Sequence, residues 1–338
     1  MRQVMGVHVV SPRSSSWFRP WWPERRTAPT RRPHPAPLAP RGLRAAGLAL
    51  LGTWLGGAAA APDLHEPPGQ MVQTADARLH LLCAGQGSPT VVLEAGLGGN
   101  HLDWTLVQPQ LARRSRVCSY DRAGSGFSDQ PTRPRTLANF AQDLESLLAS
   151  AGVDGPLVLV GHSFGGVLAA HFSASHRDRV VGLVLLDSMH PREFERFTAA
   201  GVTLPQDGGV ANRTPPAAAG YGLPAELQRL AIDLASADKA RIAMVRELRA
   251  VPASLAEADL TGYRPIPARV LVHGDGEWNG LYPDGRMETA WRAMQADLAE
   301  RLGAPAPQVV ANSGHQIPLD APASVVAAVD DVMREGRQ

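Results

Sequence analysis

Short apolar runs alternate with segments of helical periodicity along most of the chain. The apolar runs have the length and composition of buried strands, and the segments between them repeat apolar residues at the spacing of one helix face. The expected strands are residues 77–83, 90–94, 115–120, 157–160, 180–186, 268–273 and 308–311, and the expected helices are residues 104–114, 137–152, 164–176, 287–302 and 322–333. This alternation predicts an α/β fold, with a mostly parallel central sheet and helices on both faces.

One long stretch interrupts the alternation. Residues 189–263 contain no good strand; they hold a Pro/Gly-rich part at 205–224 and a helical part at 225–260. A stretch of this length between two core strands is usually a functional lid or cap. We therefore expect one domain whose core is formed by residues 71–188 and 265–338, with a helical cap inserted at residues 189–264.

The first 70 residues differ from the rest. Residues 11–44 are rich in Pro, Arg and Ser, and this composition cannot bury a core. The apolar run 45–55 and a Gly/Ala stretch ending at Pro62 follow. This order is typical of a secretory signal, and the run is shorter than the roughly 20 residues that span a bilayer. We expect an exported protein, periplasmic or secreted; the alternative is an uncleaved N-terminal membrane anchor.

The charge balance argues against a nucleic-acid partner. The chain has 33 Lys and Arg against 32 Asp and Glu, and many of the Arg residues precede residue 45. The globular part is therefore acidic and lacks a run of basic residues. We expect no nucleic acid as partner, and contact with a membrane only through an N-terminal anchor.

A candidate nucleophile lies in the sequence Gly161-His162-Ser163-Phe164-Gly165. An apolar strand enters this Gly-x-Ser-x-Gly pattern and a helix leaves it, which is the context of a nucleophile elbow. The glycines leave room for the sharp turn that projects the Ser163 hydroxyl. The amide of Phe164, at the start of the helix, can stabilise an oxyanion.

A serine hydroxyl needs a base, and the base needs an acid to orient it. We expect His315 to be the base, because its loop follows the last strand and can reach over the elbow. Asp187 ends the strand 180–186 and is our preferred acid. Asp275 and Glu277, which follow the strand 268–273, stay open as alternatives.

The second oxyanion donor is expected in the Gly-rich loop after the first parallel strand. This loop is residues 95–99, and the Leu97 amide is our candidate. We expect no metal or other cofactor: no ligand cluster has zinc spacing, and no Lys-Ser/Thr pair follows the glycines to cradle phosphate.

Four motifs in order resemble the α/β-hydrolase superfamily over roughly residues 75–335. They are the elbow at 161–166, the Asp-Arg-Ala-Gly-Ser-Gly-Phe-Ser loop at 121–128, the oxyanion loop at 93–99 with Asp103-Trp104, and Ser-Gly-His at 313–315. The family's sheet order implies neighbouring strands for Cys83 and Cys118, and so a disulfide between them. The segment 179–187 resembles some dehalogenases whose acid ends the sixth strand, which favours Asp187.

Two departures from the family pattern matter. Many members have His-Gly before the oxyanion residue, where this chain has Ala95-Gly96. Epoxide hydrolases and haloalkane dehalogenases of this superfamily use an Asp nucleophile, where this chain has Ser163. The resemblance therefore argues against those two chemistries.

These features predict a serine hydrolase that cleaves an ester or related acyl bond of a small molecule through an acyl-enzyme. The alternatives are a peptidase or amidase similar to proline iminopeptidases, a non-catalytic binding protein of the same fold, and a cofactor-free lyase or perhydrolase. Fold and triad do not specify the substrate.

Overall fold

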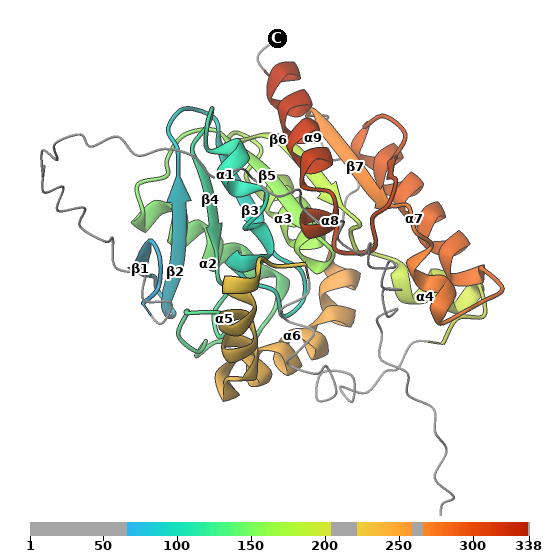
Figure 1. Ribbon diagram of the computed structural model, residues 1–338, viewed down its shortest axis with the longest axis horizontal. Helices are drawn as coiled ribbons and strands as arrows, with labels where there is room; N and C mark the ends of the chain where they lie inside the picture. Colours follow the sequence, from blue (N-terminus) through green and yellow to red (C-terminus); the bar gives the residue numbers. More distant parts are fainter. Residues whose placement is uncertain (1–65, 204–221, 259–265, 337–338) are drawn as a thin grey trace, which may run out of the picture. The chain divides into compact units, whose positions relative to one another are not determined.

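The computed structural model describes residues 66–203, 222–258 and 266–336, and within them an eight-stranded sheet in the order β1-β2-β4-β3-β5-β6-β7-β8 (Figure 1). The strands are β1 (Gln70–Gln73), β2 (Arg78–Ala84), β3 (Thr90–Glu94), β4 (Val117–Tyr120), β5 (Leu157–His162), β6 (Val180–Leu186), β7 (Ala268–His273) and β8 (Gln308–Val310). Pairing is antiparallel from β1 to β2 and from β2 to β4, and parallel across the rest. The predicted mostly parallel α/β fold is confirmed.

Helices cover both faces of the sheet. One apolar core lies between the strands and α2 (Leu137–Ser150), α3 (Phe164–Ser175) and α7 (Arg286–Leu302). A second core lies on the other face, where α1 (Gln108–Leu111) and α9 (Pro322–Glu335) pack. The central strand β5 is buried along its whole length. Two-sided burial explains why its sequence is continuously apolar up to Gly161.

The predicted helix at residues 104–114 is wrong. The structure has a 3-10 helix, η1 (His101–Trp104), and then the single-turn α1, with Pro109 in its first turn. Proline has no backbone N–H to donate, so a helix cannot run through it without losing a hydrogen bond. Several short elements of the described residues were not predicted: the edge strand β1, α4 (Glu193–Ala199), the 3-10 helix η3 (Glu277–Gly280) and the single-turn α8 (Ile317–Asp320).

The insertion between β6 and β7 contributes α4 (Glu193–Ala199), α5 (Ala225–Ser236) and α6 (Asp238–Glu257). Figure 1 shows α5 and α6 next to each other at one end of the sheet. Most of the predicted Pro/Gly-rich part of the cap, and nearly all of the predicted leader with its signal or anchor, lie outside the described residues. Within the described ranges, no helix combines the length and apolarity that crossing a bilayer requires.

The two cysteines are joined by a disulfide. Cys83 on β2 and Cys118 on β4 are partners in the antiparallel register, and the bond links them. This is the pairing that the family resemblance implied.

Candidate active site

Ser163 occupies the turn between β5 and α3. Its backbone has φ 54° and ψ −121°, a strained conformation for a residue with a side chain. Gly161 and Gly165 make the turn possible: a Cβ on Gly161 would overlap the backbone of the α3 turn, and one on Gly165 the backbone of Glu94 and Ala95. Ser163 therefore lies on a tight turn between a strand and a helix.

Strained residues mark three strand ends. Among the described residues other than glycine, positive φ occurs at Ser163 after β5, Asp187 after β6 and Asn312 after β8. Such conformations cost free energy and persist where the surroundings enforce them, commonly at functional sites. Two of the three residues are the candidate nucleophile and the preferred acid.

The carboxylate of Asp187 binds the ring of His315. The His315 Nδ1 donates to Asp187 Oδ2 at 2.6 Å, and the Trp291 Nε1 donates to Asp187 Oδ1 at 2.8 Å. Burial alone raises the pKa of the Asp187 carboxyl, but hydrogen bonds from His273 and His315 lower it below its usual range. Asp187 is therefore an anion that fixes the orientation of the His315 ring.

The alternative acids contact the backbone of the histidine loop. Glu277 Oε2 accepts a hydrogen bond from the backbone amide of His315 at 3.3 Å, and the backbone amide of Asp275 donates to the Ser313 carbonyl at 3.1 Å. His162 supports the same loop, because its Nε2 donates to the His315 carbonyl at 2.8 Å. Burial is the main cause that lowers the pKa of His162 to about 3, and the nearby His315 lowers it further. The His162 ring is therefore neutral.

His273 is a second histidine on the same carboxylate, and it was not predicted from the sequence. Its Nδ1 donates to Asp187 Oδ2 at 2.8 Å and its Nε2 donates to Glu288 Oε2 at 3.0 Å. Burial alone lowers the pKa of His273, but the hydrogen bonds to Asp187 and Glu288 raise it to about 9. The sequence signal that could have identified His273 is its position as a polar residue at the end of the apolar strand β7.

The Gly-rich loop after β3 lies beside the elbow. A Cβ on Gly96 would be 3.4 Å from the Ser163 Cβ and 3.0 Å from the His162 Nδ1. The next side chain, Leu97, is half-buried and packs against the cluster that contains the fully buried Phe164. The residues of both candidate oxyanion donors thus lie close to the candidate nucleophile.

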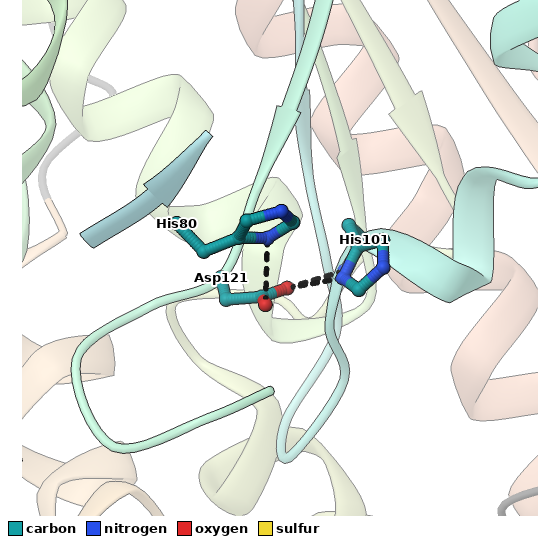
Figure 2. A group of neighbouring side chains, drawn as sticks. All are labelled: His80, His101 and Asp121. Atoms are coloured by element: carbon teal, nitrogen blue, oxygen red, sulfur yellow. Dashed lines mark hydrogen bonds and ion pairs between the residues drawn. The ribbon is translucent and has the colours of Figure 1, made fainter. Parts of the chain in front are cut away.

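His80, His101 and Asp121 form another buried group (Figure 2). Their side-chain donor atoms lie within 4.8 Å of one another, a spacing at which they could hold a metal ion. The Asp121 carboxylate, however, already accepts four hydrogen bonds. They come from His80 Nδ1 at 2.9 Å, from His101 Nδ1 at 2.8 Å, and from the backbone amides of His101 and Phe127. These bonds use its acceptor capacity. We assign the group a structural role that anchors β2, η1 and the loop after β4.

Comparisons with known proteins match the chain to one family. Residues 91–329 match the alpha/beta hydrolase family. A 123-residue stretch is 32% identical to epoxide hydrolase 3 of Xenopus tropicalis and covers 36% of this chain and 33% of that protein. In three other curated relatives, the aligned segments span 28%, 41% and 16% of the relative's own length.

Solved structures share the fold at low identity. The epoxide hydrolase CorEH superposes with a TM-score of 0.59 at 20% identity, covering 78% of this chain and 98% of that one. A thermophilic esterase from Thermogutta terrifontis superposes with a TM-score of 0.55 at 23% identity, covering 80% and 99%. At these identities the likeness shows the fold alone.

Proposed function

The chain belongs to the alpha/beta hydrolase family, and we propose that it is a serine hydrolase that cleaves an ester or related acyl bond of a small molecule. The observation that carries the proposal is the pairing of His315 with the buried Asp187, at 2.6 Å, beside an elbow that holds Ser163. A hydroxyl on a strained turn and an imidazole oriented by a carboxylate are the parts that nucleophilic acyl transfer requires.

In the proposed mechanism, Ser163 Oγ attacks the acyl carbon while His315 Nε2 takes the hydroxyl proton. The amides of Leu97 and Phe164 donate to the oxyanion that forms. His315 then protonates the leaving alcohol oxygen as the tetrahedral intermediate collapses to the acyl-enzyme. Water attacks the acyl-enzyme, His315 takes its proton and returns it to Ser163, and the acid is released.

The serine at the elbow favours ester over epoxide chemistry. The family resemblance implies an Asp nucleophile in epoxide hydrolases, where this chain has Ser163. A carboxylate opens an epoxide to an alkyl ester that water can hydrolyse, whereas a serine would leave an ether that resists hydrolysis. Ser163 therefore fits an acyl substrate.

A substrate panel tests this function. Purified protein is offered p-nitrophenyl esters of graded chain length, a matched p-nitroanilide and an epoxide, with Ser163→Ala as the control. We expect turnover of esters that Ser163→Ala loses. Hydrolysis of the anilide in preference to the ester would favour the peptidase alternative, and epoxide opening that survives Ser163→Ala would contradict the proposal.

We also propose that the protein is exported. The Cys83–Cys118 disulfide supports this, because disulfides persist in oxidising compartments and are rare in reducing ones. Expression of the full chain in a bacterial host, followed by fractionation and mass spectrometry, tests the proposal. A periplasmic product with oxidised cysteines is expected, and a cytosolic product with two free thiols would contradict it.

A further inference from the structure

A buried arginine holds the Gly-rich loop beside the elbow. Arg122, whose side chain is 3% exposed, donates to the carbonyl of Ala95 through Nη1 and to the carbonyl of Gly96 through Nη2, each at 2.6 Å. Its Nη1 also pairs with Glu94 at 2.8 Å. The neighbouring residue, Asp121, is held by hydrogen bonds from His80 and His101. The backbone that carries the Arg122 side chain is therefore fixed.

The bond to the Gly96 carbonyl determines where the next amide points. That carbonyl belongs to the same peptide group as the Leu97 N–H, and in a trans peptide the two point in opposite directions. A carbonyl held on Arg122 therefore turns the Leu97 N–H away from the guanidinium. Gly96 itself lies against Ser163, because a Cβ added to Gly96 would be 3.4 Å from the Ser163 Cβ.

The cap completes this arrangement through Glu247 of α6. Glu247 Oε1 accepts from Arg122 Nε at 2.7 Å, and Oε2 accepts from Arg122 Nη2 at 2.9 Å. The same Oε2 accepts from the Gly98 amide at 3.3 Å. The Glu247 side chain is fully buried, so this bidentate pair is shielded from solvent.

We infer that Arg122 and Glu247 form a clamp that positions the Leu97 amide as an oxyanion donor, so that cap helix α6 helps to set the oxyanion site. The inference rests on the proposed function. Arg122 and Glu247 are positioning residues that act through the loop 95–99. Removal of one oxyanion donor lowers kcat by about 100- to 1000-fold, and a misplaced donor should cost a part of this, roughly 10- to 100-fold.

Glu247→Ala and Glu247→Gln test the clamp in the full-length protein. The alanine variant removes both contacts. The glutamine variant keeps the side-chain volume and can still accept from Gly98, which guards against loss of folding. We expect kcat for a p-nitrophenyl ester to fall about 10- to 100-fold with KM within about twofold. Phenylboronic acid, which forms a tetrahedral adduct on an activated serine, should bind more weakly in proportion.

Leu230→Ala on the neighbouring helix α5 is the matched control. Leu230 is buried in an apolar cluster that contains neither Arg122 nor Glu247, so its truncation should lower the melting temperature and leave kcat and boronate affinity near wild type. Folded Glu247 variants with kcat and boronate affinity within twofold of wild type would overturn the clamp, as would an equal loss in Leu230→Ala. A wild type without Ser163-dependent ester turnover would instead refute the proposed function.

Discussion

One oxygen of Asp187 binds two histidines, and the two have different surroundings. His273 lies between Asp187 and Glu288, so each of its ring nitrogens donates to a carboxylate. Both nitrogens must then carry protons, which makes His273 an imidazolium. Its positive charge offsets the buried negative charge of Asp187 and leaves that carboxylate able to hold His315.

The identity of the acid has a direct test. Asp187→Asn should lower kcat by about 1000- to 10,000-fold, because an amide at this position cannot hold the required tautomer of His315. Asp275→Asn is the matched control and should stay within a few-fold of wild type. Ester hydrolysis by purified variants measures both. A large loss in Asp275→Asn with activity kept in Asp187→Asn would transfer the role to Asp275.

The charge on His273 predicts a pH dependence of stability. Its folded pKa, about 9, lies above the ordinary value of 6.5. Its contribution is therefore complete below pH 6.5 and is lost as pH rises through 9, because the unfolded chain releases the proton first. Urea unfolding between pH 6 and 9.5 should show this decline in wild type and a flatter profile in His273→Gln. Parallel profiles would contradict the assignment.

Helix α4 contains a buried acid, Glu193. Burial raises the pKa of Glu193 to about 8, although the His190 amide, which donates to its carboxyl at 3.3 Å, works in the opposite direction. A folded pKa above the ordinary value of 4.5 means that the unfolded chain ionises first. Stability contributed by the protonated acid is thus lost as pH rises from 4.5 to 8.

Glu193→Gln should remove this loss. The uncharged isostere should match wild type near pH 4.5 and exceed it at pH 8 by up to about 4 kcal/mol. Glu195→Gln, at an exposed position of the same helix, is the control and should retain the wild-type profile. Denaturant unfolding at pH 4.5 and pH 8 measures the free energy of unfolding of each variant. If this free energy changed between the two pH values as much in Glu193→Gln as in wild type, the prediction would be contradicted.

The elements that the sequence predicted well are those with a local cause. The strands β3, β5, β6 and β7 are apolar runs because both faces are buried, and the elbow follows from glycines around one serine. The helix predicted at 104–114 was wrong because Pro109 interrupts this segment and restricts α1 to a single turn. The edge strand β1 was missed because its four residues are only partly buried.

The contacts between distant segments could not be predicted in the same way. The sequence left three acids open for His315, since each follows a core strand and only the folded positions of the side chains distinguish them. Glu247 reads as one more charged residue of a cap helix until the fold brings it to Arg122, 125 positions away in sequence. His273 likewise could not be assigned from the sequence, because only the fold places it between Asp187 and Glu288.

The disulfide constrains the first part of the core. It joins Cys83 to Cys118, 35 positions apart, across β2 and β4. A cross-link over a loop of this length should contribute about 2–4 kcal/mol, chiefly by restricting the unfolded chain. Denaturant unfolding of the Cys83→Ser, Cys118→Ser double variant should show this loss, and a free energy of unfolding equal to wild type would contradict it.

The proposed mechanism requires that Ser163 is an activated nucleophile with His315 as its base. Labelling with a fluorophosphonate probe, followed by mass spectrometry of the modified peptide, tests it most directly in wild type, Ser163→Ala and His315→Ala. We expect one adduct on Ser163 in wild type, none in Ser163→Ala and at most slow labelling in His315→Ala. Folded wild-type protein that stays unlabelled, or that is labelled equally in all three forms, would contradict it.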